Sequence, residues 1–211
     1  MKLIGNYLSP FTRRVAVSLN ALQLPFELQA LYVFKEPEQV RVHNPVVRIP
    51  TLILDNGDVL VESYAILDEI DQMVGAERTL TPVSGKDRRE VMKVTAVGLA
   101  SMEKAQWAFY ERRVRPAEKV HQPWIDHNDR QVLGGLRFLD TLAAKAGREG
   151  WLAGGSRQSQ ADITGVVAYT FANAVRPHLN LAREVPNLAG FAARCEEMPI
   201  FRKAPLPESI S

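Results

Sequence analysis

Patterns typical of β-strands occur only in the first third of this 211-residue chain, and this restriction limits its possible folds more than any other feature. Residues 3–4 fit a short strand, residues 26–30 alternate between apolar and polar side chains, and residues 51–61 read TLILDNGDVLV. The last stretch is two β-rich runs around Asn56 and Gly57, which both tolerate the positive φ of a type I′ hairpin turn. We therefore expect one small sheet near the N-terminus.

Helical spacing fills the gaps between these strands. Apolar residues recur at three- and four-residue intervals from Phe11 to Leu22, so a helix joins the first two strands and makes them parallel. After the hairpin, Ser63 is a candidate N-cap for a second helix, which Gly75 would end. This order of elements resembles a thioredoxin-like domain, which we expect over residues 1–76.

Beyond a polar linker at residues 76–85, the pattern is helical throughout. The helix over residues 163–174 carries few charges, so we expect it to be the most buried. The predicted fold is an α/β thioredoxin-like N-terminal domain followed by an all-α domain over residues 86–211. The other helices of that domain are expected at residues 86–115, 125–146 and 187–197.

Charge, apolar content and cysteine content exclude several kinds of function. The 26 Lys and Arg residues are dispersed among 24 acidic residues, giving a net charge of +2, so we expect no nucleic-acid partner. No segment approaches the roughly 20 apolar residues that span a bilayer, and the apolar N-terminal run is too short for a signal peptide. We therefore expect a cytoplasmic protein with no membrane partner. Cys195 is the single cysteine, which excludes an internal disulfide and a Cys-x-x-Cys site.

Four motifs that lie far apart in the sequence resemble those of the soluble glutathione S-transferases. LSPFTRR resembles the start of the active site in serine-type, bacterial-like members, and NPVVRIPTL resembles the segment with the proline before the third strand. VESYAI resembles the Glu-Ser pair of the family, and SQADI the N-cap box of its buried helix. The resemblance covers nearly the whole chain and implies the glutathione S-transferase fold. It also implies a homodimer that uses glutathione as cosubstrate for an apolar electrophile, the chemistry of detoxification.

Ser9 stands where the first strand gives way to a helix, and in isolation a serine there is most simply an N-cap. The resemblance implies instead that its hydroxyl donates a hydrogen bond to the sulfur of glutathione. Lowering the pKa of a thiol by about two units from about 8.5 requires about 2.7 kcal/mol. One hydrogen bond to a charged group contributes about 1.5–3 kcal/mol, and the helix N-terminus about 0.3–1 kcal/mol. Thr12 is the rival hydroxyl, one helical turn further on, and the choice stays open.

Pro50 cannot donate to a sheet ladder, so by itself it marks the first position of a strand. The resemblance implies a cis Ile49–Pro50 bond and implies that the backbone of Ile49 pairs with the cysteinyl backbone of glutathione, like a short added strand. It also implies that Arg48 reaches the glycyl carboxylate.

Glu62 and Ser63 are assigned by the same resemblance to the γ-glutamyl end of glutathione. Glu62 would face its ammonium group, while the hydroxyl and amide of Ser63 would bind its carboxylate, since free amides at a helix start favour an anion. The alternative for Ser63 is a plain N-cap.

The remaining candidates lie in the helical region. Ser159 and Asp162 form a capping box with Asp at the fourth position, which serves folding. Trp107 and Tyr110 share one face of the long helix, either in the core or lining the electrophile pocket. His121 and His127 fit no tight ligand spacing, so we expect no metal. Alternatives to conjugation are a glutathione-dependent isomerase, dehalogenase or peroxidase, or a non-catalytic glutathione-binding or protein-interaction protein on the same fold.

Overall fold

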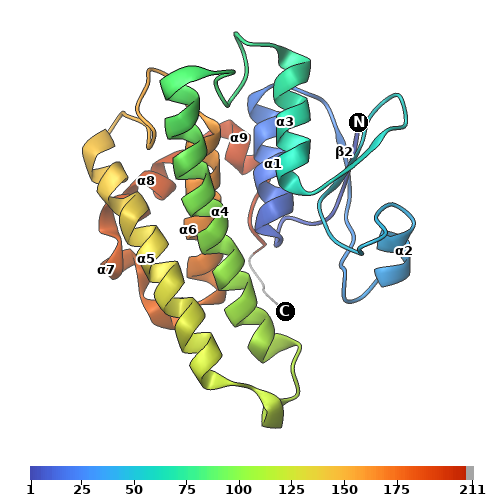
Figure 1. The fold of residues 1–211 in the computed structure, drawn as a ribbon, viewed down its shortest axis with the longest axis vertical. Helices are drawn as coiled ribbons and strands as arrows, with labels where there is room; N and C mark the ends of the chain where they lie inside the picture. Colours follow the sequence, from blue (N-terminus) through green and yellow to red (C-terminus); the bar gives the residue numbers. More distant parts are fainter. Residues whose placement is uncertain (208–211) are drawn as a thin grey trace. The chain divides into compact units, whose positions relative to one another are not determined.

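The computed structural model describes residues 1–207, which form two compact units (Figure 1). The first unit comprises Met1–Val83 together with the C-terminal segment that begins at Met198. The second unit comprises Ser84–Glu197. Within the described residues, no helix has both the length and the apolar character needed to cross a bilayer.

A four-stranded mixed sheet in the order β2-β1-β3-β4 is the centre of the first unit. Leu3 pairs with Leu28 in a parallel ladder and with Leu52 in an antiparallel one, and Leu52 pairs in turn with Leu60. The predicted parallel pair and the predicted hairpin are both present, which confirms the thioredoxin-like fold. The strands are β1 (Lys2–Ile4), β2 (Glu27–Gln29), β3 (Thr51–Ile53) and β4 (Val59–Val61).

The hairpin turn between β3 and β4 is not the predicted type I′. Gly57 has a φ of 92°, but Asn56 does not adopt a positive φ. The Gly57 N–H donates to the Leu54 carbonyl at 3.0 Å, and the Leu54 N–H donates to the Asp58 carbonyl at 2.9 Å. This is a three-residue loop that ends on a left-handed glycine. The Asn56 side chain accepts from the Asp58 N–H at 3.0 Å, a local bond that favours the observed turn.

Helices α1 and α3 lie side by side against the sheet (Figure 1). Their apolar faces supply buried side chains such as Leu19, Ile66 and Ile70, which meet the strands in one core. The period of about 3.6 residues recognised in the sequence therefore corresponds to the face that each helix buries. The helices of this unit are α1 (Pro10–Ala21), α2 (Pro37–Arg41), α3 (Ser63–Val74) and α9 (Pro199–Arg202).

The segment that contains α9 packs on α1, although the sequence analysis assigned it to the helical domain. Arg13 Nε donates to the Ala204 carbonyl at 2.8 Å, and Asn20 Nδ2 donates to the Ile200 carbonyl at 3.0 Å. Phe201 is fully buried, and its ring centre lies 6.0 Å from the Arg13 guanidinium. A helix of only four residues has no periodicity from which its packing partner could be recognised, so this placement was missed.

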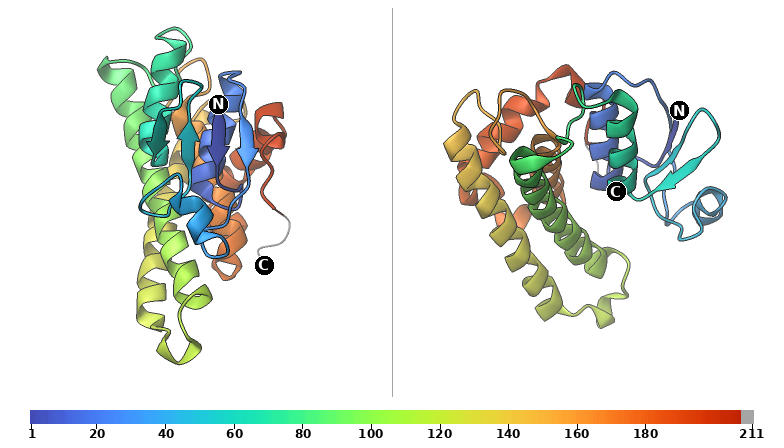
Figure 2. Two further views of the ribbon diagram at one scale, coloured as in Figure 1. Left: turned by 90° about the vertical axis from the view of Figure 1, so that its right-hand side faces the viewer. Right: turned by 45° about the horizontal axis from the view of Figure 1, so that its top comes forward.

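The second unit consists entirely of helices, as predicted. α4 packs with α5 and α6, and the two long helices α4 and α5 run side by side as a helical hairpin (Figure 2). They approach closely at Gly135, where a Cβ atom would lie 2.0 Å from Ser101 Oγ. Nearly every residue of α6 is buried. The helices are α4 (Gly85–Arg113), α5 (Gln122–Ala146), α6 (Gln160–Val175), α7 (Leu181–Glu184) and α8 (Pro186–Glu196), with 3₁₀ turns at Ala117–Lys119 and Pro177–Leu179.

Candidate active site

Ser9 is the N-cap residue of α1, with φ −68° and ψ 117°. Its Oγ accepts a hydrogen bond from the Thr12 N–H at 3.3 Å, and its own N–H donates to Asn6 Oδ1 at 3.3 Å. The simple N-cap reading therefore describes one use of this hydroxyl. A hydroxyl can accept and donate at the same time, and Ser9 Oγ makes no other hydrogen bond within residues 1–207. The side chain is half-buried, so its proton is available to a ligand.

Thr12, which carries the rival hydroxyl, is fully buried. A Cβ atom on Gly5 would lie only 2.5 Å from Thr12 Oγ1, so the threonine side chain occupies the space that this glycine leaves. Gly5 has a φ of 143°, a conformation that L side chains rarely adopt. Thr12 Oγ1 has no hydrogen-bond partner within the described part of the chain. Its hydroxyl faces the interior and is not accessible to a ligand.

The Ile49–Pro50 peptide bond is cis. The side chain of Ile49 is partly buried against a cluster that includes Ile4, Leu31 and Val40. No other described residue forms a hydrogen bond with the Ile49 N–H. A backbone donor just before β3 is therefore open to pair with an extended ligand.

Asn44 holds the segment before Pro50 and was not recognised in the sequence. It is buried, and its Nδ2 donates to the Arg48 carbonyl at 2.9 Å and to Thr51 Oγ1 at 3.3 Å. Its Oδ1 accepts from the Val46 N–H at 3.0 Å. The Asn-Pro pair at the start of NPVVRIPTL was the signal, because Asn side chains commonly bond the backbone two residues on.

Glu62 is the N-cap residue of α3 and has a left-handed φ of 68°. Its Oε1 lies 2.9 Å from Arg48 Nη1, and both side chains are about half exposed. The two residues that the resemblance assigned to opposite ends of glutathione thus contact each other. The sequence did not predict this ion pair, since Arg48 precedes β3 and Glu62 follows β4.

Ser63 is the first residue of α3, so its prediction as an N-cap was wrong by one position. The first backbone bond of the helix runs from the Ile66 N–H to the Glu62 carbonyl at 3.1 Å. The amides of residues 63–65 therefore have no intrahelical acceptor and favour an anion. Ser63 is 2% exposed.

Arg14 is a second charged residue near Glu62 that the sequence analysis did not single out. It is fully buried within α1, and burial lowers the pKa of its guanidinium to about 10, while the charge of Glu62 acts to raise it. Arg14 therefore remains cationic at neutral pH. The signal in the sequence was a pair of consecutive arginines inside an apolar helix. Its neighbour Arg13 points to the Ala204 carbonyl instead.

The two aromatic candidates of α4 differ in how far they are buried. Trp107 is 48% exposed, and its Nε1 donates to Glu103 Oε1 at 3.4 Å. Tyr110 is partly buried, and its hydroxyl accepts from Gln106 Nε2 at 3.0 Å. Trp107 thus has the exposure that contact with an apolar molecule requires.

The start of α6 is a closed capping arrangement. Asp162 Oδ2 accepts from the Ser159 N–H and from Ser159 Oγ, both at 2.8 Å, and Asp162 Oδ1 accepts from the Leu152 N–H at 2.7 Å. Burial raises the pKa of the Asp162 carboxyl, although these donors act to lower it. Both carboxylate oxygens of Asp162 accept hydrogen bonds within the unit, which is typical of a residue that stabilises a helix start.

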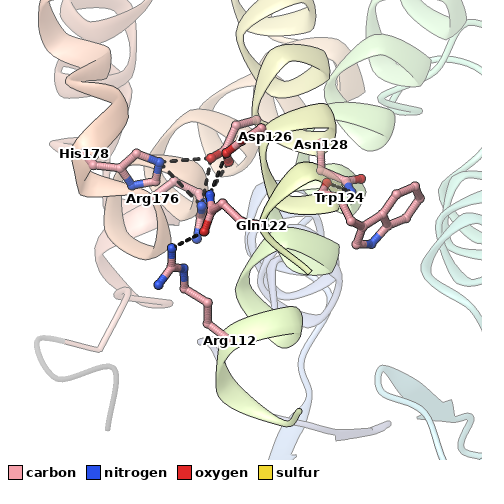
Figure 3. Close-up of polar contacts among 8 residues, drawn as sticks. Arg112, Gln122, Trp124, Asp126, Asn128, Arg176 and His178 are labelled. Atoms are coloured by element: carbon pink, nitrogen blue, oxygen red, sulfur yellow. Dashed lines mark hydrogen bonds and ion pairs between the residues drawn. The ribbon is translucent and has the colours of Figure 1, made fainter. Parts of the chain in front are cut away.

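A polar cluster joins α5 to the end of α6 (Figure 3). Arg176 is buried and donates from Nε and Nη2 to the two carboxylate oxygens of Asp129, each at 2.8 Å. His178 Nε2 lies 2.9 Å from Asp129 Oδ2. His127 stacks on Trp124 with ring centres 5.6 Å apart. Within residues 1–207 no group of three or more His, Cys, Asp or Glu side chains is arranged to hold a metal ion.

Comparisons with known proteins show what this chain is similar to in sequence and fold. The family model for the glutathione S-transferase N-terminal domain matches residues 3–78. Glutathione S-transferase U3 of Arabidopsis thaliana is 31% identical over 148 residues, which are 65% of this chain and only 63% of that relative. A probable maleylacetoacetate isomerase of Vibrio cholerae is 29% identical over 216 residues, covering 96% of this chain and 94% of the relative.

Among solved structures, a glutathione S-transferase of Methylobacterium radiotolerans in complex with glutathione sulfonate superposes with a TM-score of 0.88 at 26% identity. The match covers 100% of this chain and 97% of that one. Fold, motif order and sequence similarity coincide: residues 3–78 match the glutathione S-transferase N-terminal domain, and the whole chain has the glutathione S-transferase fold.

Proposed function

We propose that this protein is a glutathione transferase that stabilises the thiolate of glutathione through Ser9 and transfers it to an apolar electrophile. The observation that carries the proposal is the half-buried Ser9 hydroxyl at the start of α1, with its proton uncommitted within residues 1–207. This serine-type assignment rests on a donor in a position to meet an anion.

Ser9 is suited to act as a hydrogen-bond donor. Its Oγ already accepts from the Thr12 N–H, and a hydroxyl that accepts one bond is polarised toward donating another. The thiolate sulfur then accepts from Ser9 Oγ–H near the positive end of the α1 dipole. The sulfur attacks an electrophilic carbon, the S–C bond forms, and the leaving group departs with its electron pair.

The first unit would supply the binding groups for glutathione. The Ile49 N–H pairs with the cysteinyl backbone, the amides at the start of α3 and Ser63 bind the γ-glutamyl carboxylate, and Glu62 binds the ammonium group. Trp107 and Tyr110 are our candidates for contact with the electrophile. A homodimer, which the family resemblance implies, and a cytoplasmic location, which the sequence predicts, belong to the same proposal.

A glutathione-dependent isomerase is the second candidate. The similarity to the probable maleylacetoacetate isomerase of Vibrio cholerae, which extends over nearly the full length of both chains, favours it specifically. The two activities share thiolate formation at Ser9 and differ in the fate of the adduct. In conjugation the S–C bond is retained, whereas in isomerisation it breaks again after rotation about the former double bond.

Glutathione binding measured by calorimetry, together with turnover of chlorodinitrobenzene, tests the proposal. We expect binding and turnover in the wild type, and binding with strongly reduced turnover in Ser9→Ala. Ser156→Ala, at an exposed serine of the other unit, is the matched control and should behave as wild type. Full turnover by Ser9→Ala would refute the role of Ser9. Binding without turnover of chlorodinitrobenzene or of a maleylacetoacetate-type cis-alkene would indicate a non-catalytic protein.

A further inference from the structure

The ion pair between Arg48 and Glu62 joins two segments whose backbones are each held by a hydrogen bond. Arg48 precedes β3, where Asn44 Nδ2 donates to its carbonyl at 2.9 Å. Glu62 is held in a left-handed conformation, with its carbonyl bonded to the Ile66 N–H at 3.1 Å. Exposed ion pairs contribute little when both side chains must be ordered to form them. Here hydrogen bonds hold the two backbone segments in place, and the pair still has the small contribution expected of an exposed ion pair.

The contact uses only one oxygen of the carboxylate. Arg48 Nη1 lies 2.9 Å from Glu62 Oε1, and Glu62 Oε2 makes no hydrogen bond or ion pair with any other described residue. The Glu62 side chain is half exposed, and its unused carboxylate oxygen can accept from an ammonium group. Arg48 therefore fixes the direction of the carboxylate and leaves its second oxygen for a ligand.

The groups around this carboxylate favour a particular kind of ligand. Arg48 contacts Glu62, and the negative charge of Glu62 also acts on the buried Arg14. An α-amino acid end, which carries a carboxylate beside its ammonium, is favoured, because its carboxylate can bind the free amides at the start of α3.

We propose that Arg48 is a positioning residue that orients Glu62 toward the γ-glutamyl end of glutathione and does not bind the glycyl carboxylate. The inference rests on the proposed function, because it assigns a role within the same glutathione site. It replaces the expectation from the family resemblance, in which Arg48 binds at the opposite end of the tripeptide.

γ-Glutamylcysteine, which lacks the glycyl residue, separates the two roles of Arg48. If Arg48 acts through Glu62, Arg48→Gln weakens the binding of glutathione and of γ-glutamylcysteine by the same factor, about two- to five-fold for a half-exposed pair. The same substitution in a Glu62→Gln background then has no further effect, because the partner is already gone. If Arg48 binds the glycyl carboxylate, Arg48→Gln weakens only the binding of glutathione.

Calorimetric titration of the full chain with both thiols measures these constants. Arg41→Gln is the matched control, since Arg41 forms an exposed ion pair with Glu38 in the same unit, at 3.1 Å. We expect wild-type affinities from this control, and circular dichroism melts show whether each variant folds. A loss confined to glutathione, or an undiminished loss in the Glu62→Gln background, would overturn the role of Arg48 alone. Failure of the folded wild type to bind either thiol would overturn the proposed function, and this inference with it.

Discussion

Helices α1 and α6 begin in the same way and use their first serine differently. Ser9 and Ser159 are the N-cap residues, each in an extended conformation. Three residues further on, α1 has Thr12 and α6 has Asp162. Asp162 receives both the N–H and the hydroxyl proton of Ser159 at 2.8 Å, whereas the first turn of α1 contains no acidic residue.

The residue at that third position decides what the serine can do. In α6 the carboxylate accepts a hydrogen bond from the serine hydroxyl, and Ser159 is 7% exposed. In α1 the hydroxyl only accepts from the Thr12 N–H, at a longer 3.3 Å, and Ser9 is half-buried. A closed cap stabilises the fold, and an open cap retains a donor for a ligand. The comparison therefore contrasts a serine that stabilises a helix start with a serine whose hydroxyl can still donate to a ligand.

Removing the acid from the closed cap should have the largest effect. Asp162→Ala leaves three buried donors, on Leu152 and Ser159, without their acceptor. We expect a loss of about 3 kcal/mol in the free energy of unfolding and a fall in Tm of about 6–12 °C. Urea and thermal denaturation measure it. Asp126→Ala, at an exposed position of α5, is the control and should change stability by less than about 0.5 kcal/mol. Equal losses in the two variants would mean that the α6 cap is not closed as described.

Substitution of the two serines by alanine should affect different properties of the protein. Ser9→Ala should raise the pKa of bound glutathione by about one to two units and lower turnover about 10- to 100-fold. Its effect on unfolding should be only about 0.5–1 kcal/mol, since the lost cap bond is long. Ser159→Ala should destabilise by about 1–2 kcal/mol and leave the thiol pKa unchanged. Thiolate absorbance titrations and urea melts measure both quantities, and a thiol pKa that shifts in Ser159→Ala but not in Ser9→Ala would reverse the comparison.

Thr12→Val removes the rival hydroxyl and tests whether Ser9 or Thr12 is the donor to the glutathione sulfur. Thr12 Oγ1 is buried without a partner in the described chain, and valine has the same shape. The substitution should raise stability by about 0.5–1 kcal/mol, because an unpaired polar atom is removed. Turnover should stay at the wild-type level. A folded Thr12→Val protein with a raised glutathione pKa would assign the sulfur donor to Thr12 instead of Ser9.

Most of the fold could be predicted because it is encoded locally. The β-rich run that contains Leu52 and the helical spacing from Phe11 reflect residues that meet the core, so the strands and long helices were recognised with the right type. The turn at Asn56 was wrong, since two neighbouring residues tolerate several turn types and the choice depends on hydrogen bonds to Leu54 and Asp58.

The site was less predictable because its contacts join distant segments. Ser9 and Ser63 could be recognised at the starts of helices, although Ser63 lies one position inside its helix. The pairing of Arg48 with Glu62 depends on the register of β3 and β4, which brings together residues on either side of the hairpin. The burial of Arg14 depends on what covers α1, which no local pattern describes.

The smallest predicted effect is on the pH dependence of stability, which should differ between Asp162 of the α6 cap and Asp129. Burial raises the pKa of Asp162. Burial acts to raise the pKa of Asp129 as well, but the hydrogen bonds and charges of Arg176 and His178 lower it overall. A carboxyl group whose pKa is raised in the folded protein contributes its full stability at pH values below its usual pKa of 3.8. This contribution is lost as the pH rises. A lowered one gives stability that is present above 3.8 and is lost as the pH falls through the folded value.

The two carboxylates should therefore give opposite slopes between about pH 3 and about pH 6. The stability difference between wild type and Asp129→Asn should grow with pH, and the difference between wild type and Asp162→Asn should shrink. Urea denaturation at half-unit pH steps measures both differences against the same wild-type curve, which removes the titration of every other group. Slopes of the same sign would mean that Asp162 is stabilised as an anion by its donors. The closed cap would then be stabilised by the charge of Asp162, as the Asp129 cluster is stabilised by the charge of Asp129. Burial would then not explain the difference between this cap and the open cap at Ser9.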